Sequence, residues 1–408
     1  MELMRLSRAR SAAALLVLVM SAGVAGAGVG WSVVNLHPAG AESSIANGAY
    51  AANQVGSAVF GGVRHAGMWQ GTAASWEDIN PAGCSESDAY AITDGQIAGR
   101  ASVAAVGRGA LWVMGAGPVS ASWVDLYPGW PMTMATAAGD GQQAGWGVVI
   151  SPEYTDRACM WSGSAGTFID LHPAGTEHSY ATCVSAGVQG GAVQISGRHN
   201  ACIWRGSAAT FVNMNPPGRY YSEIRAMSGD EQVGYVVVGA DHASVWHGTP
   251  ESWVDIHPTA PQVGASALFG TSGGVQVGTT YILSGSDWLR HAGVWKGVSE
   301  SWMDLHQFLG PQYWESEATG VWSSGGSIAI SGYAHNGELN RDEAVVWLFE
   351  PIPPCIADFN GDGFVSFGDF DAFVTALESG AASADTNGDG FLTFEDFDVF
   401  VEAFEAGC

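Results

Sequence analysis

The chain of 408 residues contains 40 acidic and 14 basic residues, and its formal net charge is −26. Aromatic residues make up 11% of the chain and supply enough core to exclude a disordered protein. The scarcity of basic residues excludes a nucleic-acid binder, which needs cations for the phosphates. Because glycine, serine, threonine and valine are frequent where a helical bundle would have leucine, glutamate and lysine, we predict an all-β protein with a separate acidic part.

Residues 1–27 have the organisation of a secretory signal peptide. Three arginines precede an apolar run over residues 12–24, and the small residues 25–27 offer a cleavage site. The alternative is an uncleaved membrane anchor, which needs about 20 apolar residues, more than this run contains. We therefore predict cleavage near Ala27 and a mature chain without a transmembrane segment, which is secreted or lies at the cell surface of a bacterium.

Residues 31–349 contain seven copies of a unit of about 45 residues. One tryptophan marks each copy: Trp69, Trp112, Trp161, Trp204, Trp246, Trp295 and Trp347. Every unit contains four short runs with a period of two, separated by glycine or asparagine, which predicts four strands per unit. The repeat length and strand number indicate a seven-bladed β-propeller, and a β-helix is the alternative.

The two ends of the repeat region are expected to close the propeller. The chain starts with a single strand at residues 31–36 that matches the last strand of a unit, and the seventh unit lacks that strand after residues 344–349. The first strand can therefore complete the last blade as a clasp, which removes an open sheet edge.

Three units share the pattern His-Ala-x-x-Trp, at His65, His242 and His291. This pattern resembles bacterial extracellular repeats named after a His-Ala-Phe (HAF) tripeptide, although the third residue here is glycine or serine. The resemblance covers most of the repeat region and implies an extracellular location.

Residues that recur in every unit are best explained by the unit itself. We expect the seven tryptophans to pack blade against blade. Four histidines occupy one position of the repeat, where other units have asparagine or tyrosine, which indicates a hydrogen-bonding turn and not a metal site: His37, His172, His257 and His306. The Asp or Asn two residues earlier is expected to cap that turn.

Ligand binding is expected where the repeat is interrupted. Several aromatic residues fall outside the repeat pattern, in connections that antiparallel strands place on one face: Trp130, Tyr220, Tyr221, Trp288, Tyr313 and Trp314. Aromatic rings among polar groups suit a glycan or a protein partner, whereas the alternative is that they only pack the loops.

Catalytic motifs are not found, and we assign no catalytic residue. A glycosidase or lyase is the competing class, since paired carboxylates need not be close in sequence. The carboxylates available near the predicted face are Glu153, Asp156, Glu223, Glu315 and Glu317. The prediction favours a non-catalytic recognition or scaffolding protein.

The acidic part lies at residues 355–408, after the proline-rich linker 350–354, and contains no lysine or arginine. Two near-identical loops there have oxygen ligands at positions 1, 3, 5 and 12 and glycine at position 6, as in the calcium loop of an EF-hand. The predicted ligands of two calcium ions are Asp358, Asn360, Asp362, Phe364, Ser366 and Asp369 in the first loop, and Asp385, Asn387, Asp389, Phe391, Thr393 and Asp396 in the second. Because the carboxylates repel one another without an ion, metal binding and folding should be coupled.

Each loop is followed by an amphipathic stretch, and position 12 is aspartate. Duplicated units of this kind resemble dockerin modules of the type with a terminal Gly-Cys, which attach secreted proteins in a calcium-dependent manner. The resemblance implies a small helical module whose partner is cohesin-like or another component of the cell envelope. Loop positions 10 and 11 are Phe367-Gly368 and Phe394-Glu395, and they lack the hydroxyl groups that such modules usually present there.

Cysteines divide into two groups in an exported protein, where disulfides can form. Cys355 and Cys408 bracket the calcium module and are expected to join as a disulfide. Cys159, Cys183 and Cys202 are expected to remain free, because the predicted blades place them too far apart for a bond.

Overall fold

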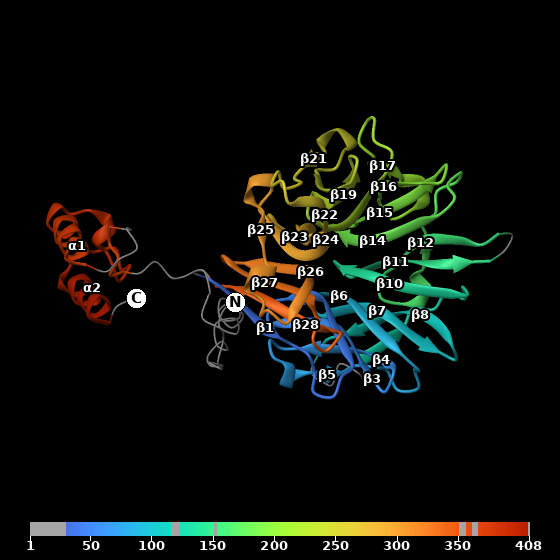
Figure 1. Cartoon of the computed structure of the whole chain (residues 1–408), viewed down its shortest axis with the longest axis horizontal. Helices are drawn as coiled ribbons and strands as arrows, with labels where there is room; N and C mark the ends of the chain where they lie inside the picture. The colour runs from blue at the N-terminus through green and yellow to red at the C-terminus, as the bar shows by residue number, and fades with distance from the viewer. Residues whose placement is uncertain (1–29, 116–121, 151–152, 351–355, 361–365, 407–408) are drawn as a thin grey trace, which may run out of the picture.

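The computed structural model describes residues 30–115, 122–150, 153–350, 356–360 and 366–406. Seven four-stranded antiparallel sheets follow one another around a central axis, which confirms the predicted seven-bladed propeller (Figure 1). The colour in Figure 1 passes from blue through green to orange around the ring.

Blades 1 to 6 are simple meanders whose first strand is innermost, and blade 7 has the same arrangement but takes its outer strand from the start of the propeller. We call the strands of each blade inner, second, third and outer. Blades 1 and 2 are β2 (Ser43–Tyr50), β3 (Asn53–Phe60), β4 (Val63–Trp69), β5 (Glu77–Asp78) and β6 (Ser87–Thr93), β7 (Gln96–Val103), β8 (Val106–Val113), β9 (Trp123–Asp125). Blades 3 and 4 are β10 (Met132–Gly139), β11 (Gln142–Val149), β12 (Thr155–Trp161), β13 (Ile169–Asp170) and β14 (Ser179–Ser185), β15 (Val188–Ile195), β16 (Arg198–Trp204), β17 (Val212–Asn213).

Blades 6 and 7 have longer strands than the other blades. Blades 5 and 6 are β18 (Ser222–Ser228), β19 (Glu231–Val237), β20 (Asp241–Trp246), β21 (Val254–Asp255) and β22 (Val263–Ser272), β23 (Val275–Ser284), β24 (Asp287–Trp295), β25 (Met303–Asp304). Blade 7 is β26 (Tyr313–Ser324), β27 (Ser327–Asn336), β28 (Arg341–Phe349) and β1 (Trp31–Asn35).

The predicted clasp is present in blade 7. β1 pairs antiparallel with β28, so that Trp31 lies opposite Phe349 and Val33 opposite Trp347. The Trp31 ring also stacks on Phe308, with ring centroids 6.1 Å apart. The first strand of the propeller therefore closes the ring, which is incompatible with the alternative β-helix.

The seven repeated tryptophans are fully buried, which confirms their predicted packing role. They contribute to separate apolar clusters that lie between neighbouring blades and form the core. Blade-to-blade packing therefore uses one large aromatic side chain per repeat.

A serine or threonine at the start of each inner strand joins neighbouring blades. Its hydroxyl oxygen accepts the backbone N–H of a third-strand residue in the preceding blade, at 2.9–3.0 Å, in all seven blades. These residues are Ser44, Ser87, Thr133, Ser179, Ser222, Ser266 and Ser316. The third strand extends beyond the outer strand, which has two to five residues, so these N–H groups would otherwise lack a partner.

The turn predicted from the repeated histidines is confirmed. In every unit the Asp or Asn side chain accepts the backbone N–H of the residue two positions later, at 2.7–2.9 Å. His37, His172, His257 and His306 then place Nδ1 within 2.7–2.9 Å of the inter-blade serine hydroxyl. Asn80 and Asn215 accept from the same hydroxyl in their blades.

Two α-helices form in the C-terminal part, α1 (Phe367–Ser379) and α2 (Phe394–Ala406). Each begins in the last positions of a predicted calcium loop and includes the amphipathic stretch that follows it. Phe373 and Phe400 are fully buried between them and stack with centroids 4.1 Å apart. No helix in the described residues is long and apolar enough to cross a membrane.

Cys159, Cys183 and Cys202 are buried and form no disulfide, as expected. Burial raises the pKa of the Cys183 thiol to about 12, so this side chain is an unreactive packing group. Cys84 is also free, whereas Cys355 and Cys408 lie outside the described residues.

Candidate functional site

One end of the propeller carries all six aromatic residues predicted to bind a ligand. Antiparallel strands bring the connections into the inner strands and the hairpins between second and third strands to this end. We call it the hairpin face; it comprises residues 36–42, 60–63, 79–86, 103–106, 126–131, 149–150, 153–155, 171–178, 195–198, 214–221, 237–241, 256–262, 284–288, 305–314 and 336–341. The sequence therefore identified the face correctly, and the structure decides which side chains are free there.

Three of the six aromatic side chains are exposed. The exposed fraction is 71% for Tyr220, 48% for Trp288 and 56% for Trp314. They belong to the consecutive blades 5, 6 and 7. These side chains are available to a ligand.

The other three pack within the propeller. Trp130 meets Phe168 edge-on, with centroids 4.8 Å apart, and Tyr221 stacks on His199 at 5.0 Å. Tyr313 is buried, and its hydroxyl donates to Glu343 at 2.8 Å. Tyr313 therefore belongs to the closure of the ring.

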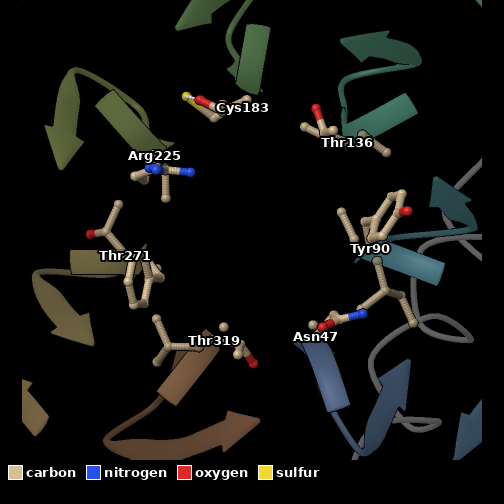
Figure 2. Close-up of a pocket in the computed structure, with 18 of the residues that line it drawn as sticks. Asn47, Tyr90, Thr136, Cys183, Arg225, Thr271 and Thr319 are labelled. Atoms are coloured by element: carbon tan, nitrogen blue, oxygen red, sulfur yellow. Dashed lines mark hydrogen bonds between the residues drawn. The ribbon is translucent and has the colours of Figure 1, made fainter. Parts of the chain in front are cut away.

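A channel of about 230 Å³ runs along the axis between the inner strands (Figure 2). Each inner strand has a β-bulge at the same position, and the bulge residues line the channel: Asn47, Tyr90, Thr136, Thr182, Arg225, Phe269 and Thr319. The next residue in each strand is Gly, Ala or Cys, because the neighbouring blade lies close by; a Cβ on Gly320 would lie 2.9 Å from the backbone oxygen of Asn47.

Four of the seven bulge residues bond to the next blade around the ring. Asn47, Thr136, Thr182 and Thr319 each donate to the carbonyl oxygen that precedes the next bulge, at 2.6–2.8 Å. Tyr90, Arg225 and Phe269 make no such bond. A ring of polar side chains thus stabilises the channel wall, and Arg225 adds a cation that faces the opening (Figure 2).

Glu223 is the centre of a charged cluster beside Arg225. Its carboxylate lies 2.5 Å from His199 Nδ1 and 2.6 Å from Arg225 Nη2, and it accepts from the Tyr221 hydroxyl at 3.2 Å. Burial opposes the charge on Glu223, but the hydrogen bond from His199 and the charge of Arg225 outweigh burial and hold the pKa of Glu223 below its usual value. Glu223 is therefore a paired, ionised carboxylate.

Arg290 joins blades 6 and 7 in a similar cluster. Its guanidinium lies 3.3 Å from Glu315 and 3.4 Å from Glu317, and it donates to the Tyr333 hydroxyl at 2.9 Å. Burial raises the pKa of Glu317 above its usual value, although Arg290 opposes the change. Glu315 and Glu317, the two carboxylates of blade 7 that the enzyme alternative names, thus both contact Arg290.

Glu153 and Asp156, the other two carboxylates that the enzyme alternative names, are in blade 3. Asp156 accepts from the Tyr180 hydroxyl at 2.7 Å and lies 3.5 Å from His178. The backbone carbonyl of Glu153 accepts from Thr155 at 3.5 Å. Asp156, Glu223, Glu315 and Glu317 therefore each have a hydrogen-bond or ion-pair partner within the protein.

Arg225, His199, Tyr180 and Tyr235 belong to the same site and were missed by the sequence reasoning. The four rings that stack across blades 4 and 5 are, in order, Tyr180, His199, Tyr221 and Tyr235. Their successive centroid distances are 5.7, 5.0 and 6.1 Å. Arg225 is the only charged residue among the seven channel bulge residues, and a cation at that repeat position was the available signal.

The second predicted calcium loop is described in full. The Asp385 carboxylate accepts the backbone N–H groups of Asp389 and Gly390 at 3.1 and 2.9 Å. Asp396 is fully buried and accepts those of Thr386, Asn387 and Thr393, at 3.0, 3.3 and 2.8 Å. Gly390 has a φ of +85°, which the sharp turn of such a loop requires.

The first loop is described in part. Asp369 is buried and accepts from the N–H groups of Asn360 and Ser366 at 3.1 and 2.8 Å, as Asp396 does in its loop. Asp362 and Phe364 lie outside the described residues. Over the described part of the chain, no three His, Cys, Asp or Glu side chains are gathered as metal ligands. The donors of the second loop are nevertheless carboxylate and amide oxygens, the type that calcium prefers.

Comparisons with known proteins found only distant similarities. No family model matches the chain, and no curated protein matches its sequence. Similar solved structures include a puromycin hydrolase (11% identity, TM-score 0.46, 77% of this chain and 55% of that one) and an oligogalacturonate lyase from Vibrio parahaemolyticus (9%, 0.47, 77% and 93%). The β-propeller domain of the Trilobed protease from Pyrococcus furiosus is also similar (9%, 0.45, 64% and 82%). The chain thus spans about half the length of the hydrolase, and similarities this distant assign no function to it.

Proposed function

We propose that this protein is an exported, non-catalytic recognition or scaffolding protein of the bacterial surface. Its propeller would bind a glycan or protein through the hairpin face, and its dockerin-like C-terminal module would attach it in a calcium-dependent manner. The observation that carries the proposal is the exposure of Tyr220, Trp288 and Trp314 on one face of three consecutive blades. Exposed aromatic side chains gathered on one face are a feature of binding surfaces.

The state of the carboxylates supports binding over catalysis. A general acid or base must lie within hydrogen-bond reach of the substrate proton that it transfers. Glu223 and Asp156 are instead held by His199, Arg225 and Tyr180. These pairs give the face a rigid polar surface.

The calcium module is proposed from the chemistry of its loops. Asp385, Asn387 and Asp389 would hold one ion in the second loop, with the equivalent residues of the first loop holding another. Since residues 355–408 contain no lysine or arginine, no side-chain cation within the module neutralises these carboxylates. A bound calcium ion supplies that positive charge, and the buried Asp369 and Asp396 would fix each loop to the helix that follows it.

The test uses the full-length mature chain. Isothermal titration with calcium should show two bound ions, and calcium should be required for retention of the chain on envelopes of a bacterium that produces it. Retention that persists unchanged in a chelator would contradict calcium-dependent attachment. A separate pull-down of envelope polysaccharide and protein by the propeller face tests recognition, and recovery of neither would contradict it.

A second candidate is cleavage of a polysaccharide. Its support is that the charge of Arg225, whose side chain faces the channel, acts on both Glu223 and Glu317. Burial raises the pKa of Glu317, whereas the bond from His199 and the charge of Arg225 hold the pKa of Glu223 below its usual value, and acid–base pairs use such an opposition. Release of reducing ends or unsaturated products from polysaccharides by the parent chain, and loss of that release in Glu317→Gln, would establish this activity in place of simple binding.

A further inference from the structure

In blades 6 and 7 the inner strand continues further toward the hairpin face than in the other five blades. Besides the bulge that faces the channel, these two strands contain a second β-bulge near the hairpin face, at Gly264 and at Trp314. Each lies five residues before its blade's channel bulge, Phe269 or Thr319. In blades 2 and 4 the same two-against-one hydrogen bonding occurs at the end of the strand pair, but the inner strand does not continue beyond it. Bulges of this kind often re-aim a side chain beside a binding site.

Each second bulge carries an indole ring that lies on a glycine. In blade 6, Trp288 comes from the third strand and covers Gly264, where an added Cβ would overlap the ring. In blade 7, Trp314 is itself the bulge residue and covers Gly337, where an added Cβ would also overlap. Both rings are thus supported from one side by backbone, while 48% and 56% of their residues' surfaces remain exposed.

We propose that Trp288 and Trp314 form a paired stacking platform for a neutral oligosaccharide. The inference rests on the proposed recognition function and names the ligand class of the hairpin face. The apolar faces of sugar rings stack on exposed indoles, and a ring that is already held in place loses little conformational entropy on binding. Sheets that pack face to face lie about 10 Å apart, so two rings at the second bulges of neighbouring blades suit a chain of two or more sugar rings.

The polar groups close in sequence to the two indoles fit hydroxyl groups. Arg290 follows Trp288 by two residues, and its backbone N–H and guanidinium bind Glu315, the neighbour of Trp314, at 3.2 and 3.3 Å. This bridge links the two blades that carry the rings. Sugar hydroxyls can donate to the carboxylates and accept from the guanidinium of such a pair.

The local charge favours a neutral ligand over an acidic one. The charged residues at the strand ends and hairpins next to the two indoles are four acids and two bases: Asp287, Glu315, Glu317, Glu338, Arg290 and Arg341. Both cations are already paired, Arg290 with Glu315 and Glu317, and Arg341 with Glu343. A polyanionic chain would meet a net negative surface, whereas a neutral chain needs only stacking and hydrogen bonds.

Affinity electrophoresis of the full-length mature chain tests the platform. The gels contain one soluble probe each: xyloglucan, mixed-linkage β-glucan, galactomannan or polygalacturonate. We expect the parent chain to be retarded by at least one of the three neutral probes and not by polygalacturonate. Trp288→Ala and Trp314→Ala should each weaken that retardation at least tenfold, and the Phe variants should keep part of it. Tyr154→Ala, which removes an exposed aromatic ring of blade 3, is the matched control and should bind as the parent does.

The outcomes separate the platform from the broader function. Neutral-glycan binding that is unchanged in both Ala variants, with near-ultraviolet circular dichroism showing the parent fold, overturns the platform. Preferential binding of polygalacturonate overturns the neutral class. A parent chain that binds no probe but captures an envelope protein through the same face overturns the platform and leaves recognition standing, and a parent chain that captures nothing overturns both.

Discussion

The hydroxyl oxygen of Ser266 accepts the backbone N–H of Ala243 at 2.9 Å, and the two residues belong to neighbouring blades. The same hydroxyl lies 2.7 Å from Nδ1 of His257, which the turn before the inner strand holds in place. One side chain thus connects a buried backbone group of one blade to the turn of the next. Its repetition in all seven blades explains why the unit keeps serine or threonine at this position.

Removal of this hydroxyl should destabilise the propeller. Ser266→Ala leaves the Ala243 N–H group buried without a partner, and we expect a loss of about 1–3 kcal/mol in the free energy of unfolding. The midpoint of urea denaturation measures the change. Ser286→Ala, at an exposed serine of the same blade, is the control and should unfold as the parent does. Equal midpoints for both variants would show that the inter-blade bond contributes nothing.

Tyr313→Phe should reduce stability without affecting ligand binding. The Tyr313 hydroxyl accepts from Asn35 of the clasp strand at 2.9 Å and donates to the buried Glu343 at 2.8 Å. Its loss leaves those two groups without one partner each, which costs about 1–3 kcal/mol. Thermal unfolding and the affinity gels together check this expectation. Weaker glycan binding at unchanged stability would instead place Tyr313 in the ligand site.

The turn histidines make the propeller sensitive to acid. Burial and the neighbouring His291 lower the pKa of His306 to about 4, from 6.5 in an unfolded chain. Between these values the unfolded state binds more protons, so the free energy of unfolding is fully retained above pH 6.5 and falls as the pH drops toward 4. The contribution of His306 is about 3 kcal/mol.

Urea midpoints measured from pH 7.5 to pH 4 check this prediction. His306→Asn places at blade 7 the residue that blades 2 and 5 already use, at Asn80 and Asn215. The variant should lose less stability than the parent as the pH falls. Parallel pH profiles for the two proteins would refute the role of His306.

Asp396→Ala should disrupt the second calcium loop and the start of α2. The substitution removes the acceptor for three backbone N–H groups and one of the proposed ligands. We expect calorimetry to show one calcium ion in place of two, with a loss of helical signal in far-ultraviolet circular dichroism. Asp398→Ala, at an exposed helix position, is the control with the same change of charge. Two ions bound to Asp396→Ala would contradict the loop assignment.

Removal of calcium by a chelator should leave the propeller intact. No proposed ligand lies in residues 31–349, and the blades are held by tryptophan packing and inter-blade hydrogen bonds. Only the helical signal of the C-terminal part is expected to fall, and addition of calcium should restore it. A shift in the unfolding midpoint of the propeller itself would show that calcium acts elsewhere in the chain.

The sequence by itself determined the number of blades, the clasp and the structural roles of the repeated tryptophans and histidines. These features repeat every 42–49 residues or depend on local periodicity, so a single sequence reveals them by comparison of its own repeats. The sequence also shows that acidic residues without any lysine or arginine are concentrated in the C-terminal part, at residues 355–408. Calcium binding by the two loops there stays a prediction.

Only the tertiary structure decided which of the irregular residues are available. Tyr313 and Trp314 are adjacent in sequence, yet one closes the ring and the other is exposed, because a bulge at Trp314 turns its side chain away from the core. Glu223, which pairs with Arg225, likewise meets His199 of the preceding blade only when blades 4 and 5 pack against each other. Contacts between blades depend on packing across more than 20 residues of sequence, which local patterns do not encode.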